Sequence, residues 1–141
     1  MPTDVRPSEW PQGSGYAHGM MAEGRVLCLA GQIGWDARTQ LVVPGGLVPQ
    51  IRQALANVVT VLEAGGGTPS DIVRLTWFIT DRDGYLREQK AIGSAYRDVM
   101  GKHFPAMSVI VVAGLLERDA LVEIEATAVV PSDTRINSTG A

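Results

Sequence analysis

The sequence predicts an α+β fold: a single domain of order β-β-α-β-α-β-β, in which one mixed sheet carries two helices on one face. Its 141 residues suit one domain of ordinary size. The hydrophobic pattern changes several times between the period of a strand and the period of a helix. Glycine, proline or acidic residues accompany each change and mark the turns between the elements.

The first two strands are predicted over residues 16–21 and 25–32, and we expect them to form a hairpin across the tight turn Glu23-Gly24. Cys28 lies between two leucines in the second strand, which predicts a buried and inert thiol. As the only cysteine, it excludes an intrachain disulfide. This cysteine usage favours a reducing cytoplasm as the compartment.

The two helices follow from apolar stripes. The first helix is predicted between Gly46 and Gly65, because apolar residues recur there every three or four positions. These residues are Leu47, Ile51, Leu55, Val58 and Leu62. The second helix is predicted from a cap at Asp81 or Asp83 to about Met100. Its stripe consists of Ile92, Ala95, Tyr96 and Val99.

Three further strands are predicted over residues 72–80, 106–113 and 121–130. The segment 72–80 is rich in β-branched and aromatic residues and apolar on both faces, which is typical of a central strand covered on both sides. Because the two helices cover only one face of the sheet, the other face needs a second cover. We therefore expect the chain to self-associate.

The two ends of the chain differ from this central segment. Residues 1–12 are polar and contain three prolines, so we expect an irregular segment there, a folded domain over 13–130 and a flexible tail over 131–141. No apolar run approaches the roughly 20 residues of a membrane span, so we expect no membrane partner. Twelve Lys and Arg against 15 Asp and Glu give a net charge of −3, which argues against a nucleic-acid partner.

Several short strings occur in a characteristic order along residues 13–130. They are Gly15-Tyr16-Ala17-His18-Gly19, Ala30-Gly31-Gln32-Ile33, Gln50 to Asn57 (QIRQALAN), Asp71 to Thr76 (DIVRLT), Phe104-Pro105-Ala106-Met107-Ser108 and Val122-Glu123-Ile124-Glu125-Ala126. In this order and spacing the chain resembles the YjgF/RidA family. The resemblance implies the chorismate-mutase-like RidA fold and a homotrimer whose sheets face inward. It also implies a small-molecule ligand in clefts between subunits and no cofactor.

In the deaminases of that family, an arginine after Pro-Ala holds the substrate carboxylate, and a glutamate positions the water that attacks an imine. By resemblance, the catalytic residue here is Glu123. Met107 stands where the arginine belongs, and a thioether cannot hold a carboxylate. The chain is therefore identified as a divergent member, and Arg25 or Arg118 could supply the missing cation.

The resemblance and the residue types together predict the rest of the site. The expected substrate-binding residues are Tyr16, Gly31, Met107, Val109, Trp35 and His18. Four of them have a structural alternative: Tyr16 could only pack at an interface, Gly31 could only bend its strand, Trp35 could cap the edge of the core, and His18 could be a surface histidine. We expect no metal site, because no ligand cluster surrounds either histidine.

Glu123 and Glu125 point to the same face of their strand, and both could be solvated charges. The resemblance favours Glu123 for catalysis and leaves Glu125 a structural or solvent-facing role. Two functions stay open. One is an imine or enamine hydrolase that does not act on 2-aminoacrylate, and the other is a small-molecule-binding trimer without turnover. Some members of the family are labelled ribonucleases or translation inhibitors, a role that the acidic chain does not favour.

Overall fold

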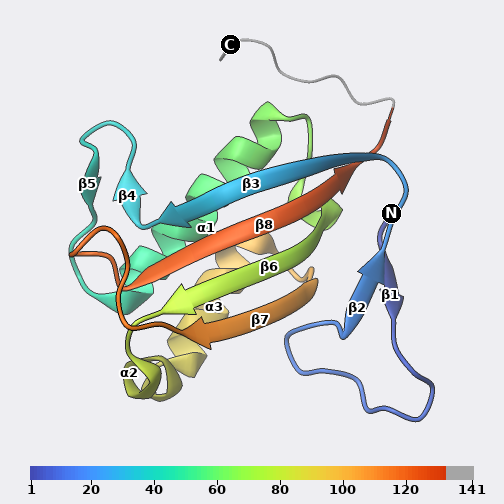
Figure 1. Cartoon of the computed structure of the whole chain (residues 1–141), viewed down its shortest axis with the longest axis horizontal. Coiled ribbons are helices and arrows are strands. Elements are labelled where there is room, and N and C mark those ends of the chain that lie inside the picture. The colour runs from blue at the N-terminus through green and yellow to red at the C-terminus, as the bar shows by residue number, and fades with distance from the viewer. Residues whose placement is uncertain (133–141) are drawn as a thin grey trace.

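A four-stranded mixed sheet forms the centre of the molecule, which is described here for residues 1–132 from a computed structural model (Figure 1). In spatial order its strands are β3 (Arg25–Ile33), β8 (Val122–Val130), β6 (Ile72–Ile79) and β7 (Ala106–Val111). β8 runs antiparallel to both of its neighbours, and β6 pairs with β7 in parallel. The predicted α+β class is confirmed, and 72–80 is a central strand as expected.

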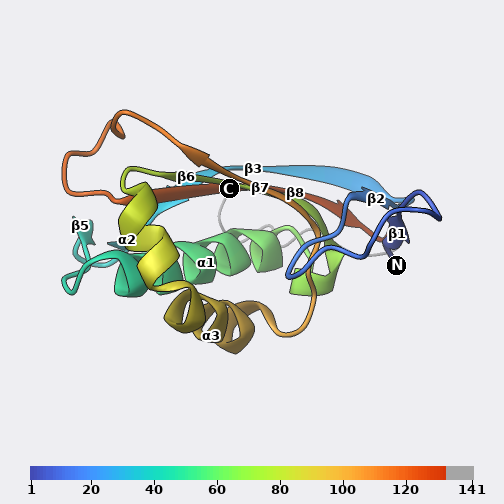
Figure 2. The same cartoon turned by 90° about the horizontal axis from the view of Figure 1, so that it is seen from below.

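Helices α1 (Leu47–Ala64) and α3 (Gln89–Met100) pack on one face of this sheet, as Figure 2 shows from the side. The predicted stripe of α1 is confirmed, because Ile51, Leu55, Val58 and Leu62 are fully buried. Together with strand residues such as Ile72 and Ile124 they form one core. The helix ends at Gly65, and the following Gly66 has a positive φ of 85° that favours glycine.

The predicted second helix is two helices. α2 (Arg82–Arg87) is capped by Asp81, whose side chain accepts a hydrogen bond from the Gly84 amide, and it ends at Glu88, where α3 begins. α2 buries no residue, whereas α3 buries the expected Ile92 and Tyr96. The change of direction at Glu88 lets α3 pack against α1 while α2 lies at the end of the sheet (Figures 1 and 2).

The predicted hairpin at the start of the chain is wrong. β2 (Gly19–Met21) pairs with β1 (Thr3–Val5) in a separate two-stranded sheet, and β3 pairs with β8. The expectation of an irregular segment over 1–12 therefore fails at β1. The turn at Gly24 is real, with a φ of 147°, but the strand hydrogen bonds of β2 go to a segment that the local pattern does not reveal.

Three short elements complete the fold. β4 (Trp35–Asp36) and β5 (Leu41–Val42) form a small hairpin beyond β3, and the 3₁₀ turn η1 (Pro69–Asp71) leads into β6. Within residues 1–132, no helix has the length and apolar character needed to cross a membrane. Apart from residues 131 and 132, the expected flexible tail lies outside the described residues.

The second face of the sheet carries no helix from residues 1–132 (Figure 2). On β6 this face presents Arg74, Thr76 and Phe78, so the strand is not apolar on both faces as predicted. Cys28 is exposed on the same face, and the prediction of a buried thiol is wrong for the single chain. The reason is strand alternation, which turns Leu29 toward the helices and Cys28 away from them. We call this surface the open face.

Candidate functional site

Glu123 lies on the open face, near the start of β8. Its register partners are Ile33 on β3 and Phe78 on β6. A bulge in β3 between Leu29 and Gln32 brings Gly31 against this glutamate. A Cβ atom built on Gly31 would lie 2.7 Å from Cδ and 2.9 Å from Oε2 of Glu123. The structure thus places two of the predicted site residues in contact.

A buried glutamine holds the loop that leads into β8. The side chain of Gln50 on α1 is 4% exposed; its Nε2 donates to the carbonyl oxygen of Asp119 at 3.0 Å, and its Oε1 accepts from the amide of Leu121 at 2.7 Å. Leu121 is two residues before Glu123. The glutamine therefore ties the position of the candidate catalytic residue to α1.

Glu125 occupies a different environment on the same face. It is exposed, whereas Glu123 is half-buried, and it lines a cavity of about 170 Å³ together with Cys28, Arg74 and Thr76. Gly31 does not line this cavity. The two glutamates thus have different surroundings on one face of the sheet, and their different roles stay a prediction.

Tyr16, Met107 and Val109 come together elsewhere, beside β7. Ala17 pairs with Ala106 in a parallel bridge, and its amide donates to the carbonyl oxygen of Pro105 at 3.1 Å, which brings Tyr16 next to the start of β7. Tyr16, Met107 and Val109 line a cavity of about 270 Å³, together with Ser14, Gly15 and Tyr85. We call this the Tyr16 cavity.

His18 contacts Tyr16 but does not line the Tyr16 cavity. Its ring contacts the rings of Tyr16 and Trp10 edge to face, with a centroid distance of 5.2 Å in each case. Its Nε2 lies 3.1 Å from the carbonyl oxygen of Pro11. The predicted substrate-binding role of His18 thus has no support in the single chain, and its observed contacts position the tyrosine.

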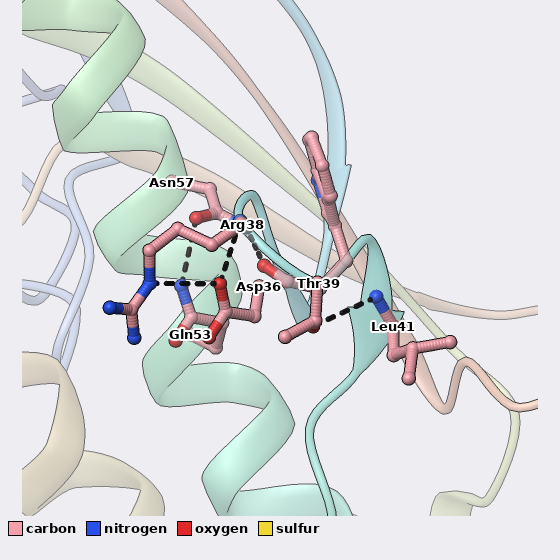
Figure 3. Close-up of polar contacts among 7 residues, drawn as sticks. Asp36, Arg38, Thr39, Leu41, Gln53 and Asn57 are labelled. Atoms are coloured by element: carbon pink, nitrogen blue, oxygen red, sulfur yellow. Dashed lines mark hydrogen bonds and ion pairs between the residues drawn. The ribbon is translucent and has the colours of Figure 1, made fainter.

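Trp35 lies at the β4–β5 hairpin, two residues after Ile33, the register partner of Glu123. Asn57 holds this region by donating from Nδ2 to the carbonyl oxygens of Ile33 and Trp35, at 3.1 and 2.9 Å, and it accepts a hydrogen bond from Gln53 (Figure 3). The hairpin turn is closed by local bonds, such as the one from the Leu41 amide to Thr39 Oγ1. Trp35 lines a cavity of about 250 Å³ with Glu117 and Asp119, away from Met107.

A larger cavity of about 380 Å³ adjoins the Tyr16 cavity. The two cavities share the lining residues Ser14, Gly15, Tyr85 and Met107. We call the larger one the aromatic cavity. Its other lining residues are Trp77, Gln89, Ile92, Gly93, Tyr96, Arg97 and Phe104. Burial raises the pKa of the hydroxyl groups of Tyr85 and Tyr96, which therefore stay protonated at neutral pH.

Arg97 is the functional candidate that the sequence reasoning missed. Arg25 and Arg118, which it named, line neither cavity beside β7. The sequence does contain a pattern that points to Arg97. Gln89, Gly93 and Arg97 follow one another at four-residue spacing and therefore share one side of a helix. The chain thus places one arginine in a cavity that Met107 also lines.

The sheet separates the two groups of candidate residues. Met107 and Val109 pair with Leu75 and Trp77, whose side chains point to the helix side, whereas Glu123 pairs with Phe78 on the open face. Within one chain, Glu123 and the Tyr16 cavity therefore lie on opposite faces of the sheet. A ligand held by both needs residues from two copies of the chain.

Among residues 1–132, no group of three or more His, Cys, Asp or Glu side chains could hold a metal ion. His103, the titratable residue nearest to Met107 in sequence, is engaged structurally. Its Nε2 lies 2.7 Å from the carbonyl oxygen of Ile72, and its own carbonyl accepts a hydrogen bond from Tyr96 at 2.6 Å.

Known proteins share this sequence pattern and this fold. The chain is 32% identical to a 2-iminobutanoate/2-iminopropanoate deaminase from Capra hircus, in an alignment that covers 81% of this chain and 79% of the relative. The crystal structure of YyfB from Yersinia pestis, a Rid family protein of unknown function, matches with a TM-score of 0.81 and 32% identity over 92% of this chain and 98% of that one.

A third similarity is to TdcF from E. coli, whose crystal structure has bound serine. It matches with a TM-score of 0.65 and 30% identity, covering 90% of this chain and 98% of that one. The family model described as Endoribonuclease L-PSP matches residues 9–130, which is most of the chain. The chain therefore belongs to the endoribonuclease L-PSP family, the YjgF/RidA family that its sequence strings resemble.

Proposed function

We propose that this protein hydrolyses an imine or enamine of a small molecule in a site that two copies of the chain share. The observation that carries the proposal is the separation of Glu123 and Gly31 from the Tyr16 cavity by the sheet. One copy supplies the glutamate and the glycine. The other supplies Tyr16, Met107 and Val109.

A contact of this kind joins two different surfaces and is therefore heterologous, so it closes into a ring when the rotation between copies allows. The homotrimer of the family is such a ring, with the sheets facing inward. The open face supports this arrangement because it carries exposed apolar side chains, including Val26 at 67% and Ile110 at 43% exposure. Burial of this apolar surface in the ring favours assembly.

Glu123 can perform the step that imine hydrolysis requires. Its carboxylate accepts a hydrogen bond from water and takes a proton as the water oxygen bonds to the imine carbon. Glu123 passes this proton to the nitrogen, then takes the remaining proton from the carbinol oxygen and passes it to the nitrogen as well. The carbon–nitrogen bond breaks, ammonia leaves and the oxygen becomes a carbonyl. The imine and one water thus give a ketone and ammonia. The backbone amide of Gly31 can donate a hydrogen bond to the oxygen on the reacting carbon, because glycine has no side chain to block the approach.

The substrate differs from that of a short 2-imino acid deaminase. The Capra hircus relative is named a deaminase of 2-iminobutanoate and 2-iminopropanoate, and the structure of TdcF has bound serine. Proteins of this fold therefore accept small amines and imines. Here Met107 stands in the place of the carboxylate-binding arginine. We infer a substrate whose reacting carbon carries no carboxylate, or one whose carboxylate is held elsewhere, and we do not expect turnover of 2-aminoacrylate.

A complementation experiment tests the shared site. Two inactive variants are made, Glu123→Gln and Met107→Trp, the second of which fills the Tyr16 cavity. An amino-acid or amine oxidase generates imines in the assay, and the loss of imine is followed. Co-expressed variants should recover activity in about a quarter of the sites by random assortment. Two separately purified variants kept apart remain inactive and are the control. No recovery on co-expression contradicts a site built from two copies.

A second candidate function is that of a small-molecule-binding protein without turnover. For either function we expect the cytoplasm as the compartment, because the chain has a single cysteine. The observation that favours the binding function is the apolar lining of the Tyr16 cavity by Met107 and Val109. Two results together would support this function. The Glu123→Gln variant keeps ligand binding, and the natural chain hydrolyses none of the imines that the oxidase generates from the amines tested. The acidic chain gives no support for a nucleic-acid partner.

A further inference from the structure

We propose that the aromatic cavity binds the body of the substrate and that Arg97 holds an anionic group on it, distant from the reacting carbon. The expected substrate is a planar, largely apolar imine with a carboxylate at its far end. This inference rests on the proposed function, because it assigns the reacting carbon to the Tyr16 cavity.

The walls of the aromatic cavity suit a flat ring. The Tyr96 ring stacks on Phe104 at a centroid distance of 5.3 Å and on Trp77 at 6.3 Å, and Tyr85 meets Trp77 edge to face at 6.5 Å. Aromatic walls attract a planar apolar ligand through stacked and edge-to-face contacts. The volume of about 380 Å³ lies in the range of small-molecule sites.

Trp77 contributes to the apolar wall of the aromatic cavity. It is 2% exposed, it lines the cavity, and its indole Nε1 is buried without a hydrogen-bond partner among residues 1–132.

Arg97 provides the charge. Its guanidinium has no ion pair or hydrogen bond within residues 1–132, although the neighbouring Asp98 forms an ion pair with Arg52 at 3.1 Å. A Cβ atom on Gly93, one turn earlier in α3, would approach Arg97 Nη1 at 3.3 Å, so glycine leaves the guanidinium room above the cavity. A free guanidinium is suited to bidentate binding of a carboxylate.

The order of the two cavities sets the position of the anionic group. Tyr16 and Val109 line only the Tyr16 cavity, and Arg97 lines only the aromatic cavity. Met107 and Tyr85 lie between them because they line both. A substrate whose reacting carbon lies beside Tyr16 therefore reaches Arg97 with the far end of its side chain.

Stable ketones that resemble the product test this inference by calorimetry. The probe is 4-acetylbenzoate, with acetophenone as the match without the carboxylate and pyruvate as the short 2-keto acid. The natural chain should bind 4-acetylbenzoate at least roughly tenfold more tightly than either. Arg97→Gln should reduce 4-acetylbenzoate binding to the level of acetophenone, and Arg97→Lys should restore part of it. Arg52→Gln is the matched control and should leave binding unchanged.

The results separate this inference from the proposed function. Equal affinities for the three probes, or full 4-acetylbenzoate binding in Arg97→Gln, overturn the inference. So does an absence of all probe binding, which means that a neighbouring copy fills the cavity. Glu123-dependent hydrolysis of short imines without probe binding refutes the inference alone. Probe binding that depends on Arg97, without hydrolysis of any imine, supports the cavity and refutes the enzyme function.

Discussion

The carboxyl group of Glu123 lies directly against the α-carbon of Gly31, at a spacing that leaves no room for a side chain. A Cβ atom at residue 31 would lie 2.7 Å from Cδ of the glutamate, which is closer than real contacts of this kind. The contact joins β8 to the bulge in β3. It makes the position of the candidate catalytic carboxylate depend on a glycine that comes 92 residues earlier in the chain, by 123 − 31.

We expect Gly31→Ala to displace this carboxylate. The new methyl group forces the side chain of Glu123 to rotate, so turnover should fall on the order of tenfold or more, while the free energy of unfolding changes by about 1 kcal/mol or less because the glutamate is flexible. Gly114→Ala is the control, since a Cβ there has open space. Equal turnover in both variants would show that the contact has no role in catalysis.

Glu123→Gln and Glu125→Gln should separate the two glutamates. Residues two apart on a strand are roughly 6.6 Å apart along it, so only one carboxylate reaches a given water. Glu123→Gln should lower imine turnover on the order of a hundredfold and keep ligand binding, as loss of a general base commonly does. Glu125→Gln should retain nearly full turnover. The measurement is imine loss in the oxidase assay, and equal losses in both variants would refute the assignment.

Met107→Arg should restore binding of short 2-keto acids. An arginine at this position adds a bidentate carboxylate contact beside Tyr16, which should raise the affinity for pyruvate by roughly tenfold or more. Met107→Gln is the control for size and polarity without charge. Calorimetry compares the two variants with the natural chain. No gain in the arginine variant would mean that residue 107 does not face the ligand.

Light scattering should give a mass of three chains of 15.0 kDa. Because the sheets face inward in the proposed trimer, Ile110→Asp on the open face should release monomers, since an unpaired buried carboxylate is costly. Val61→Asp on α1 is the control and should leave the mass unchanged, as its side chain is 38% exposed on the helix side. A natural chain with the mass of one copy at all concentrations contradicts the trimer.

Gln50→Leu should destabilise the chain. The variant removes both partners of the loop before β8 and leaves the amide of Leu121 without its acceptor, which should lower the free energy of unfolding by about 1 to 3 kcal/mol in urea. Gln53→Leu is the matched control on the same helix, because Gln53 donates only to the partly buried side chain of Asn57. Similar stabilities would show that the loop finds other partners.

The sequence alone determined the features that depend on interactions between residues close together in the chain. The stripe from Leu47 to Leu62 places all its apolar residues on one side of α1, and no distant contact is needed to predict that. The same holds for the cap at Asp81, which bonds to an amide three residues away. The alternation of β3 likewise predicts that Leu29 and Cys28 point to opposite faces.

Tertiary structure decided which of those faces is covered and which strands pair. The local pattern around Gly24 is the same whether β2 pairs with β3 or with β1. The structure shows that β1 is the partner. Cys28 is exposed because both large helices pack on the other face of the sheet. Burial of a strand side chain depends on what packs against its face, and that information lies in distant segments.

The candidate site shows the same division. Sequence strings identified Glu123, Gly31, Tyr16 and Met107 one by one, since the resemblance depends on residue order. Only the register of the sheet put Glu123 on one face and Met107 on the other, so a site that uses both residues would need two copies of the chain. The neighbourhood of Arg97 was likewise invisible, because a helix spacing tells which residues share a side and not which cavity that side meets.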